Sequence, residues 1–296
     1  MLPDIVTFWH GSIDALRQTC LRSQVAAGHK VTVYSFDPIP GLPEGVGNAE
    51  AEAVLPHSFA EKLRPAEPDG SWRDWTMLQF SDFFRMRLMA QRAGLWLDAD
   101  VLLLKGVELD PAKPYFAWER PRQLGNSVLY LPQNDPIVRA FEALMQQDEL
   151  IPDWLALRHR LTFAMRRLRG KSNRLADIRV AIYGPAALTA LARRADELQH
   201  ALPKRSFYAV HAEPRLFFEP SDFSRYLNDP GIIGLHISPK GRGKAAPIPG
   251  SLYAWAAQRF GQRNTLSQAL ANLICRKVRP RRRPHMGQPF YLGGTP

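Results

Sequence analysis

Two aspartates interrupt an apolar run in "GLWLDADVLLLKG", residues 94–106. Asp98 and Asp100 stand one residue apart in a stretch whose pattern is otherwise that of a buried strand. Buried carboxylates are unfavourable unless a positive group meets them. Two close carboxylates suit a hard divalent cation such as Mg²⁺ or Mn²⁺, which completes its shell with phosphate oxygens and water. The pair therefore predicts a cation site, with a surface turn as the plain alternative.

An aspartate and an arginine precede this run on a predicted helix over 81–94, "SDFFRMRLMAQRAG". We expect Ser81 to be the N-cap of this helix and Gly94 to end it. Asp82 and Arg85 are three residues apart and therefore share a face. The first-turn N–H groups of such a helix would also favour an anion. The plain alternative for Asp82 is a charge that only stabilises the helix start.

The geometry of the chain predicts that these groups meet. One glycine joins the helix to the strand from Leu95, so the two elements run antiparallel. The strand advances about 13 Å up to Asp98, and the helix spans about 20 Å. Asp98 and Asp100 should lie beside the first half of the helix, at the C-terminal edge of the sheet, where open α/β sheets bind ligands. An arginine at that edge suits a diphosphate or sugar hydroxyls.

The surrounding elements predict the fold class, which is α/β. "DIVTFWHG" (4–11) and "KVTVYSFD" (30–37) are predicted strands, and the helix between them should be capped by Ser12. This is a βαβ unit, which predicts parallel strands. A loop rich in proline and glycine follows, with a short strand at 53–55. Further strands are expected at 114–119, 126–132 and 231–239, and helices at 135–148, 153–169, 185–200 and from 252. We therefore expect a mixed, mostly parallel sheet with helical insertions.

The net charge of +11 is concentrated in two segments. Residues 158–174 hold seven Lys or Arg and residues 276–284 hold six, with no acid in either segment. Such clusters favour polyanions, the alternative being a solvated helix face and a disordered tail. No nucleic-acid-binding motif accompanies the charge, so an anionic membrane surface is favoured over nucleic acid. We divide the chain into one domain, 1–275, and a basic tail, 276–296.

Cysteine usage and the absence of long apolar runs predict the compartment. Cys20 and Cys275 form no metal or redox pattern and favour a reducing environment. The N-terminal residues lack the pattern of a signal peptide, and no apolar run approaches the roughly 20 residues that cross a bilayer. We expect a cytoplasmic protein, or one bound peripherally to the inner face of a membrane.

Residues 81–101, "SDFFRMRLMAQRAGLWLDADV", resemble the signature "SDxxRxxxLxxxGGxYxDxDV" of glycosyltransferases with a DXD sugar-binding region. That group includes yeast-type α-mannosyltransferases, α1,4-galactosyltransferase-like enzymes, and bacterial capsular or lipopolysaccharide transferases. A looser likeness runs through "FWHG", "NSVLYLP", "YGPAALT" and "LHISP" and covers residues 4–240. Two features depart from the signature: Ala93 replaces the first glycine of the usual pair, and no tryptophan follows the late histidine. The resemblance implies a GT-A-type nucleotide-sugar-binding sandwich and a role in bacterial polysaccharide biosynthesis.

The same resemblance implies roles for individual residues. Asp100 would bind Mn²⁺ or Mg²⁺ directly, while Asp98 would contact the ribose or donor sugar, and the metal through water. His236 would complete the metal or diphosphate site, although a lone strand histidine is commonly structural. Asp82 and Arg85 would hold the hydroxyls and phosphate of the donor. The remaining donor contacts would be Phe8, Trp9 and His10 around the nucleotide and Asn126 beside the sugar.

The activity that the resemblance implies is metal-dependent, retaining transfer of a sugar from a nucleotide sugar. A UDP-sugar is favoured over a GDP-sugar, and the acceptor would be a surface glycan or a lipid-linked molecule. Two rival functions stay open at this point. One is a polyanion-binding protein with a degenerate, inactive transferase site. The other is a metal-dependent phosphohydrolase, which would need two metals and more acids than the sequence brings together.

Overall fold

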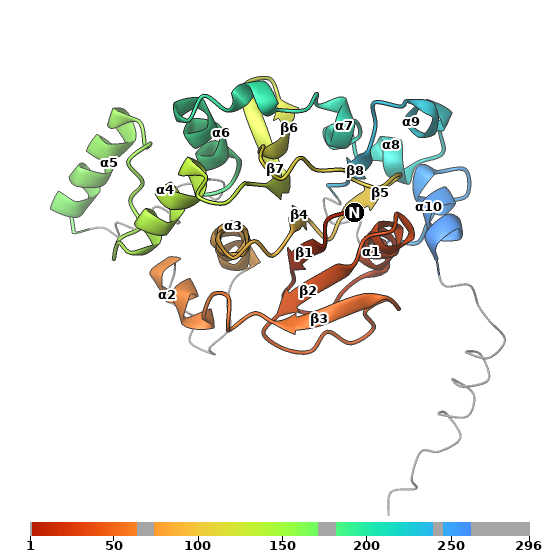
Figure 1. Cartoon of the computed structure of the whole chain (residues 1–296), viewed down its shortest axis with the longest axis horizontal. Coiled ribbons are helices and arrows are strands. Elements are labelled where there is room, and N and C mark those ends of the chain that lie inside the picture. Colours follow the sequence, from red (N-terminus) through yellow and green to blue (C-terminus); the bar gives the residue numbers. More distant parts are fainter. Residues whose placement is uncertain (1, 64–73, 171–181, 239–244, 262–296) are drawn as a thin grey trace, which may run out of the picture. The chain divides into compact units, whose positions relative to one another are not determined.

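A mixed six-stranded sheet forms the centre of the computed structural model, which describes residues 2–63, 74–170, 182–238 and 245–261 (Figure 1). The strand order is β3-β2-β1-β4-β7-β6, and the first four of these strands run parallel to one another. Strand β7 pairs antiparallel with β4, and β6 pairs antiparallel with β7. The strands are β1 (Ile5–Phe8), β2 (Val31–Ser35), β3 (Val46–Glu50), β4 (Leu95–Leu97), β6 (Tyr115–Arg120) and β7 (Gln123–Tyr130). The predicted α/β class, with a mixed and mostly parallel sheet and helical insertions, is confirmed.

Helices cover both faces of this sheet. They are α1 (Ala15–Ala26), α2 (Ala60–Leu63), α3 (Asp74–Ala90), α4 (Pro136–Met145), α5 (Leu157–Leu168), α6 (Pro185–Arg194), α7 (Arg205–Tyr208), α8 (Arg215–Phe218), α9 (Ser224–Asn228) and α10 (Leu252–Phe260), with 3-10 turns η1 (His57–Phe59) and η3 (Leu198–His200). Helices α3, α4 and α6 lie on one face, and α1 and α10 lie on the other (Figure 1). No helix among the described residues is long and apolar enough to cross a membrane.

The strand side chains alternate between two apolar layers. Val6 and Phe8 of β1 join the layer that contains α3, whereas Ile5 joins the layer beneath α1. In β4, Trp96 faces the α3 layer and its neighbours Leu95 and Leu97 face the other. This alternation is the two-residue period of a strand. Because both faces of the sheet are covered at its centre, β1 and β4 are buried along their whole length.

The chain leaves the six-stranded sheet directly after β4. Asp98, Ala99 and Asp100 form the break, and β5 (Val101–Leu103) then pairs antiparallel with β8 (Gly234–His236) in a separate two-stranded sheet. Val101 lies opposite His236 in this pairing, and the N–H of Ile237 donates to the carbonyl of Asp100 at 3.0 Å. The predicted strand that is broken at the two aspartates is therefore present. The β5–β8 pairing brings a histidine from far along the chain to the break.

Ser81 is not the N-cap that the sequence predicted. Helix α3 extends upstream to Asp74, and the Ser81 hydroxyl donates to the carbonyl of Leu78 at 2.7 Å. A serine inside a helix can satisfy its hydroxyl in this way. Met77 and Phe80 continue the buried face upstream of Ser81, so packing extends the helix beyond the local capping signal. The predicted anion site at a helix N-terminus beside Ser81 was therefore wrong.

Two further local predictions also differ from the structure. Helix α1 is capped by Asp14, whose carboxylate accepts from the N–H of Arg17 at 3.0 Å, and Ser12 lies outside the helix. The strand predicted at 53–55 is a turn, and β3 is instead formed by the sequence "VGNAE". The last four of these residues are poor strand formers, but the parallel pairing with β2 overrides their propensity. The domain boundary at 275 and the tail 276–296 lie outside the described residues.

Gly94 fixes the junction between α3 and β4. Its φ is +135°, a backbone conformation that residues with a side chain rarely adopt. A Cβ at this position would also overlap the carbonyl oxygen of Asp4. The next N–H, from Leu95, donates to that same oxygen at 2.9 Å. The backbone of Gly94 therefore lies directly against β1 and sets where β4 begins.

We expect Gly94→Ala to lower the melting temperature by about 5 °C or more, because backbone strain of about 1–3 kcal/mol is joined by the overlap with Asp4. Gly170→Ala is the matched control, since Gly170 also has positive φ (+62°) but has nothing within 4 Å of the added Cβ. Thermal unfolding of both variants measures the difference. Equal losses would show that β1 moves aside freely and that Gly94 does not fix the junction.

Candidate functional site

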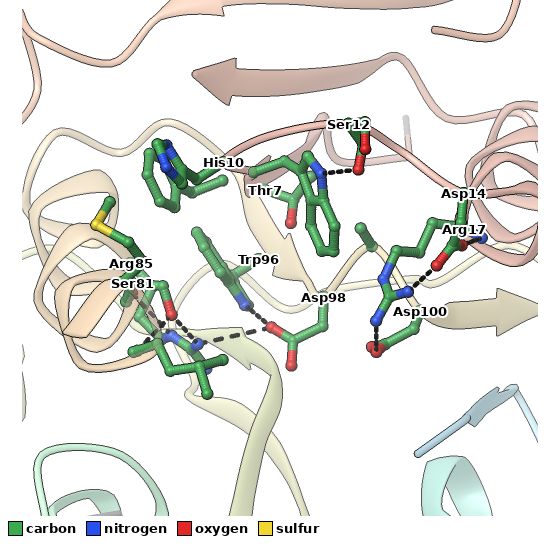
Figure 2. Close-up of a pocket in the computed structure, with 15 residues that line it drawn as sticks. Thr7, His10, Ser12, Asp14, Arg17, Ser81, Arg85, Trp96, Asp98 and Asp100 are labelled. Carbon is green, nitrogen blue, oxygen red and sulfur yellow. Dashed lines mark hydrogen bonds and ion pairs between the residues drawn. The ribbon is translucent and has the colours of Figure 1, made fainter. Parts of the chain in front are cut away.

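Each aspartate of the break lies beside its own arginine. Arg85 Nη2 of α3 is 3.6 Å from Asp98 Oδ1, and Arg17 Nη2 of α1 is 3.7 Å from Asp100 Oδ2. Figure 2 shows the two arginines on opposite sides of the aspartates, with Arg85 next to Asp98 and Arg17 next to Asp100. The positive groups that two half-buried carboxylates require are therefore provided within the protein.

Arg85 is held in place from several directions. Its Nε donates to the Ser81 carbonyl at 3.2 Å, and its Nη1 donates to the carbonyl of Asn126. The guanidinium also stacks over the Trp96 ring, 4.6 Å from the ring centroid. The Trp96 indole in turn donates to Asp98 Oδ1 at 2.7 Å. With 4% of its surface exposed, Arg85 presents a fixed charge at the site.

Asp98, Asp100 and His236 form a group that fits a divalent cation. His236 Nε2 lies 3.3 Å from Asp100 Oδ1 and 3.9 Å from Asp98 Oδ2. One ligand atom from each residue lies within 4.8 Å of the other two. Two carboxylate oxygens and one imidazole nitrogen suit Mn²⁺, and the carboxylates alone suit Mg²⁺. The donor set therefore matches the metal that the resemblance implies.

Electrostatics between Asp100 and His236 favours an ion pair. Burial of the Asp100 carboxyl opposes its ionisation, but the hydrogen bond and charge of His236, together with Arg17, lower its pKa overall. Burial likewise disfavours the charged His236 ring, but the hydrogen bond and charge of Asp100, with Asp98 and Glu119, raise its pKa overall. A bound cation would take the place of the imidazolium proton between these groups.

His236 is oriented by groups that the sequence did not point to. Its ring lies 3.1 Å from the Ser127 hydroxyl and stacks on the His211 ring, with the centroids 4.6 Å apart. His211 Nε2 is 3.3 Å from Glu119 Oε1. The Tyr208 and His236 rings form a T-shaped pair with their centroids 5.4 Å apart. These contacts fix the ring plane of His236, as outer-shell contacts do for metal ligands.

A buried polar cluster adjoins Arg85 on the other side. The Asn126 amide donates to Asp82 Oδ1 at 2.8 Å, and Arg85 Nη2 is 3.5 Å from the same oxygen. Gly184, at the N-cap of α6, lies so close that a Cβ there would be 2.8 Å from Asn126 Nδ2 and from Asp82 Oδ2. Burial is the largest influence on Asp82 and raises its pKa to about 6.

A cavity of about 460 Å³ opens at this edge of the sheet (Figure 2). It is lined by Thr7, Phe8, Trp9, His10, Ser12, Asp14, Arg17, Met77, Leu78, Ser81, Arg85, Trp96, Asp98, Ala99 and Asp100. Six of the nine site residues proposed from the sequence are in this lining. The other three, Asp82, Asn126 and His236, are not in the lining but contact residues that are. The cavity is large enough for part of a nucleotide sugar.

The three residues at the end of β1 differ in their surroundings. Phe8 is buried and packs against Phe84 of α3, with ring centroids 4.7 Å apart. Trp9 is half-buried, and Arg17 lies 4.7 Å above its ring. His10 is exposed at the cavity wall. The wall therefore combines aromatic surface with a cationic group, which suits a nucleobase and a phosphate.

Sequence reasoning missed Arg17, Ser127, Glu119, His211 and Gly184. For Arg17 a signal was available, because the first turn of a helix that follows β1 must begin at the C-terminal edge of the sheet. For Gly184 the segment "YGPAALT" is part of the looser likeness to the glycosyltransferases, but the sequence assigned no role to its glycine. Glu119 and His211 depend on contacts between distant segments, for which the sequence carries no local signal.

No protein-family profile matches the chain, and no curated protein matches it either. Among solved structures, the chain is similar to one described as PaToxG glycosyltransferase, with a TM-score of 0.39 and 13% identity. The similarity covers 85% of this chain and 86% of that one. At so low a TM-score, the function has to be inferred from the residues of the site.

The raised pKa of Asp82 predicts a pH-dependent cost to stability. The carboxyl titrates near 4 in the unfolded chain and at about 6 in the fold. The stabilisation by the protonated form is therefore complete below pH 4 and is lost as the pH rises through 6. We expect Asp82→Asn to be more stable than the wild type at pH 8, by up to about 3 kcal/mol, and the difference to become small at about pH 3.5, below the pKa of the unfolded chain.

Thermal unfolding at both pH values, without divalent metal, provides the measurement. Lower stability of Asp82→Asn at pH 8 would mean that the ion pair with Arg85 outweighs the desolvation of the carboxylate.

Proposed function

We propose that this chain is a metal-dependent, retaining glycosyltransferase that uses a nucleotide-sugar donor. The observation that carries the proposal is the grouping of Asp98, Asp100 and His236 with Arg85 beside an aromatic-walled cavity. A UDP-sugar is the favoured donor, with a GDP-sugar as the second choice. The acceptor class is a surface glycan or a lipid-linked molecule, in a cytoplasmic step of bacterial polysaccharide biosynthesis. These finer assignments rest on the motif resemblance.

The leaving group of such a reaction is a nucleoside diphosphate, whose developing charge must be stabilised. When bound, Mn²⁺ or Mg²⁺ held by Asp100, Asp98 and His236 would supply positive charge to the diphosphate. Arg85 would add a positive charge at a fixed position beside the diphosphate. Arg17, which lines the same cavity, offers a second guanidinium toward the nucleotide side.

Recognition of the donor divides between two parts of the site. We assign Phe8, Trp9 and His10 to the nucleotide, because aromatic surface at the end of β1 lines the cavity. We assign Asp82 and Asn126 to the hydroxyls of the sugar, where a carboxylate and an amide can each make hydrogen bonds. For the reaction itself we propose front-face attack by the acceptor, assisted by the leaving phosphate. No side chain of the site is assigned as a nucleophile.

Two rival functions make different demands on the structure. A phosphohydrolase with two metals needs a second group of ligands. Among the described residues, one group of three or more possible ligands is present, and it is the Asp98–Asp100–His236 group. A polyanion-binding protein without catalysis would not need a carboxylate pair at its positive site. The transferase is therefore the better match to this arrangement.

The division into a domain, 1–275, and a basic tail, 276–296, belongs to the same proposal. The six basic residues at 276–284 would hold the enzyme at an anionic inner membrane surface, each contributing about 1 kcal/mol. A lipid-linked acceptor would be presented at that surface. Nucleic acid is not a proposed partner.

A donor screen tests the proposed function. Purified protein is incubated with UDP- and GDP-sugars, with Mn²⁺, with Mg²⁺ and with a chelator, and release of the nucleotide is measured. We expect release from one donor class, dependent on the divalent cation. Asp100→Asn should abolish metal-dependent nucleotide binding without unfolding, because it removes an anionic ligand. Asp110→Asn, an exposed aspartate, is the matched control. Full activity in Asp100→Asn would show that the site is wrongly assigned.

Arg85→Lys tests the guanidinium. Lysine keeps the charge but cannot make bidentate bonds. We therefore expect the variant to lose about 2–4 kcal/mol of transition-state stabilisation, with a matching fall in turnover. The matched control is Arg87→Lys on the same helix, where Arg87 pairs with Glu142 at 3.0 Å. Steady-state kinetics with the donor found in the screen gives both values. A change below threefold in Arg85→Lys would remove Arg85 from the mechanism.

A further inference from the structure

Helix α5 presents a row of large apolar side chains to solvent. Leu157, Leu161, Met165 and Leu168 are 71%, 58%, 51% and 85% exposed. Their spacing of four, four and three residues places them on one face of the helix. They are four of the six exposed large apolar residues among the described parts of the chain. Single exposed apolar residues are ordinary, but a contiguous row of them marks an interaction surface.

This orientation is fixed by the rest of the molecule. Phe163, on the opposite side of the helix, is buried and belongs to the same apolar layer as α4 and α6. Arg160 anchors the first turn by donating from Nε to the Leu155 carbonyl at 3.1 Å and from Nη2 to the Asp153 carbonyl. In Figure 1, α5 stands beyond α4 at the edge of the fold. The apolar row therefore faces outward because Phe163 holds the other side of the helix.

The charged residues of the segment that contains α5 have one sign. From Leu157 to residue 174 the chain carries seven Lys or Arg and no acid. Arg158 and Arg169 are exposed at the two ends of the helix. An exposed row of Leu and Met flanked by basic residues is typical of a helix that lies in a membrane interface. An acidic protein groove would complement the charge but would not require so exposed an apolar row.

We propose that α5 lies in the plane of an anionic lipid bilayer, with Leu157, Leu161, Met165 and Leu168 inserted below the headgroups and the flanking arginines among them. The helix, about 18 Å long, would contact the surface along its whole length. This docking does not depend on the proposed transfer reaction or on residues 276–296. It adds apolar insertion, which salt does not screen, to any attraction by charge.

A site-specific label tests insertion separately from binding by the basic tail. Leu161→Cys is made in a Cys275→Ser background and labelled with an environment-sensitive fluorophore; Cys20 is buried. We expect a blue shift of the label when vesicles of phosphatidylcholine with phosphatidylserine are added, and a smaller shift with phosphatidylcholine alone. The matched control carries the label at Ile248→Cys, which is 47% exposed outside α5, and should not shift.

Sedimentation with the same vesicles at low salt and at about 1 M salt gives the second measurement. At high salt the charge attraction is screened, and the remaining binding should fall on the order of tenfold or more in Leu157→Ser/Leu161→Ser/Leu168→Ser. Ile248→Ser should leave it unchanged. An unchanged melting temperature confirms that each variant is folded.

Three outcomes would overturn the proposal. The first is vesicle binding without a shift of the label at position 161, which would assign all binding to other segments. The second is a blue-shifted label before vesicles are added, independent of protein concentration, which would mean that another segment of the chain covers α5. The third is a shift that grows with protein concentration alone, which would make this face a contact between two copies of the chain.

Discussion

The site depends on the compensation of two carboxylates placed where the chain passes from one sheet to another. Asp98 and Asp100 lie at the break after β4, and each has a guanidinium within 4 Å, from Arg85 and Arg17 respectively. His236 faces both carboxylates from β8. The arginines offset the charge from the sides, while the ligand atoms of the two acids and the histidine remain close enough to share one cation. Without these partners the break would bury uncompensated charge.

The topology explains why these partners arrive from unrelated parts of the chain. Helices α1 and α3 cover opposite faces of the sheet, so Arg17 and Arg85 approach the break from opposite sides (Figures 1 and 2). The parallel strands β1 and β4 end at the same edge, which places Trp9 and Asp98 at one cavity. The antiparallel pairing of β5 with β8 then fixes the position of His236. A binding site at the C-terminal edge thus follows from the strand order itself.

Local pattern was sufficient for much of the fold. The βαβ unit, the break at the aspartates and the start of α10 were predictable, because strand alternation and capping are encoded within a few residues. Local pattern misled where packing extends an element, as at Ser81, or where pairing overrides propensity, as in β3. In the site, sequence spacing placed Asp82 and Arg85 on one helix face, but the stack of His211 on His236 arises only from the folding together of distant segments.

Asp82 is a buried carboxyl that lowers the stability of this edge of the fold at neutral pH. Its carboxyl is buried, its pKa is raised, and its partners Asn126 and Arg85 only partly offset the desolvation. The backbone at Gly184 lies so close that no side chain fits between it and the acid. An apolar residue or an amide would remove the desolvation cost, as apolar residues do through the rest of this layer. Under the proposed function this cost has a reason, because a carboxylate beside a fixed guanidinium would serve as an acceptor for the hydroxyls of the donor sugar.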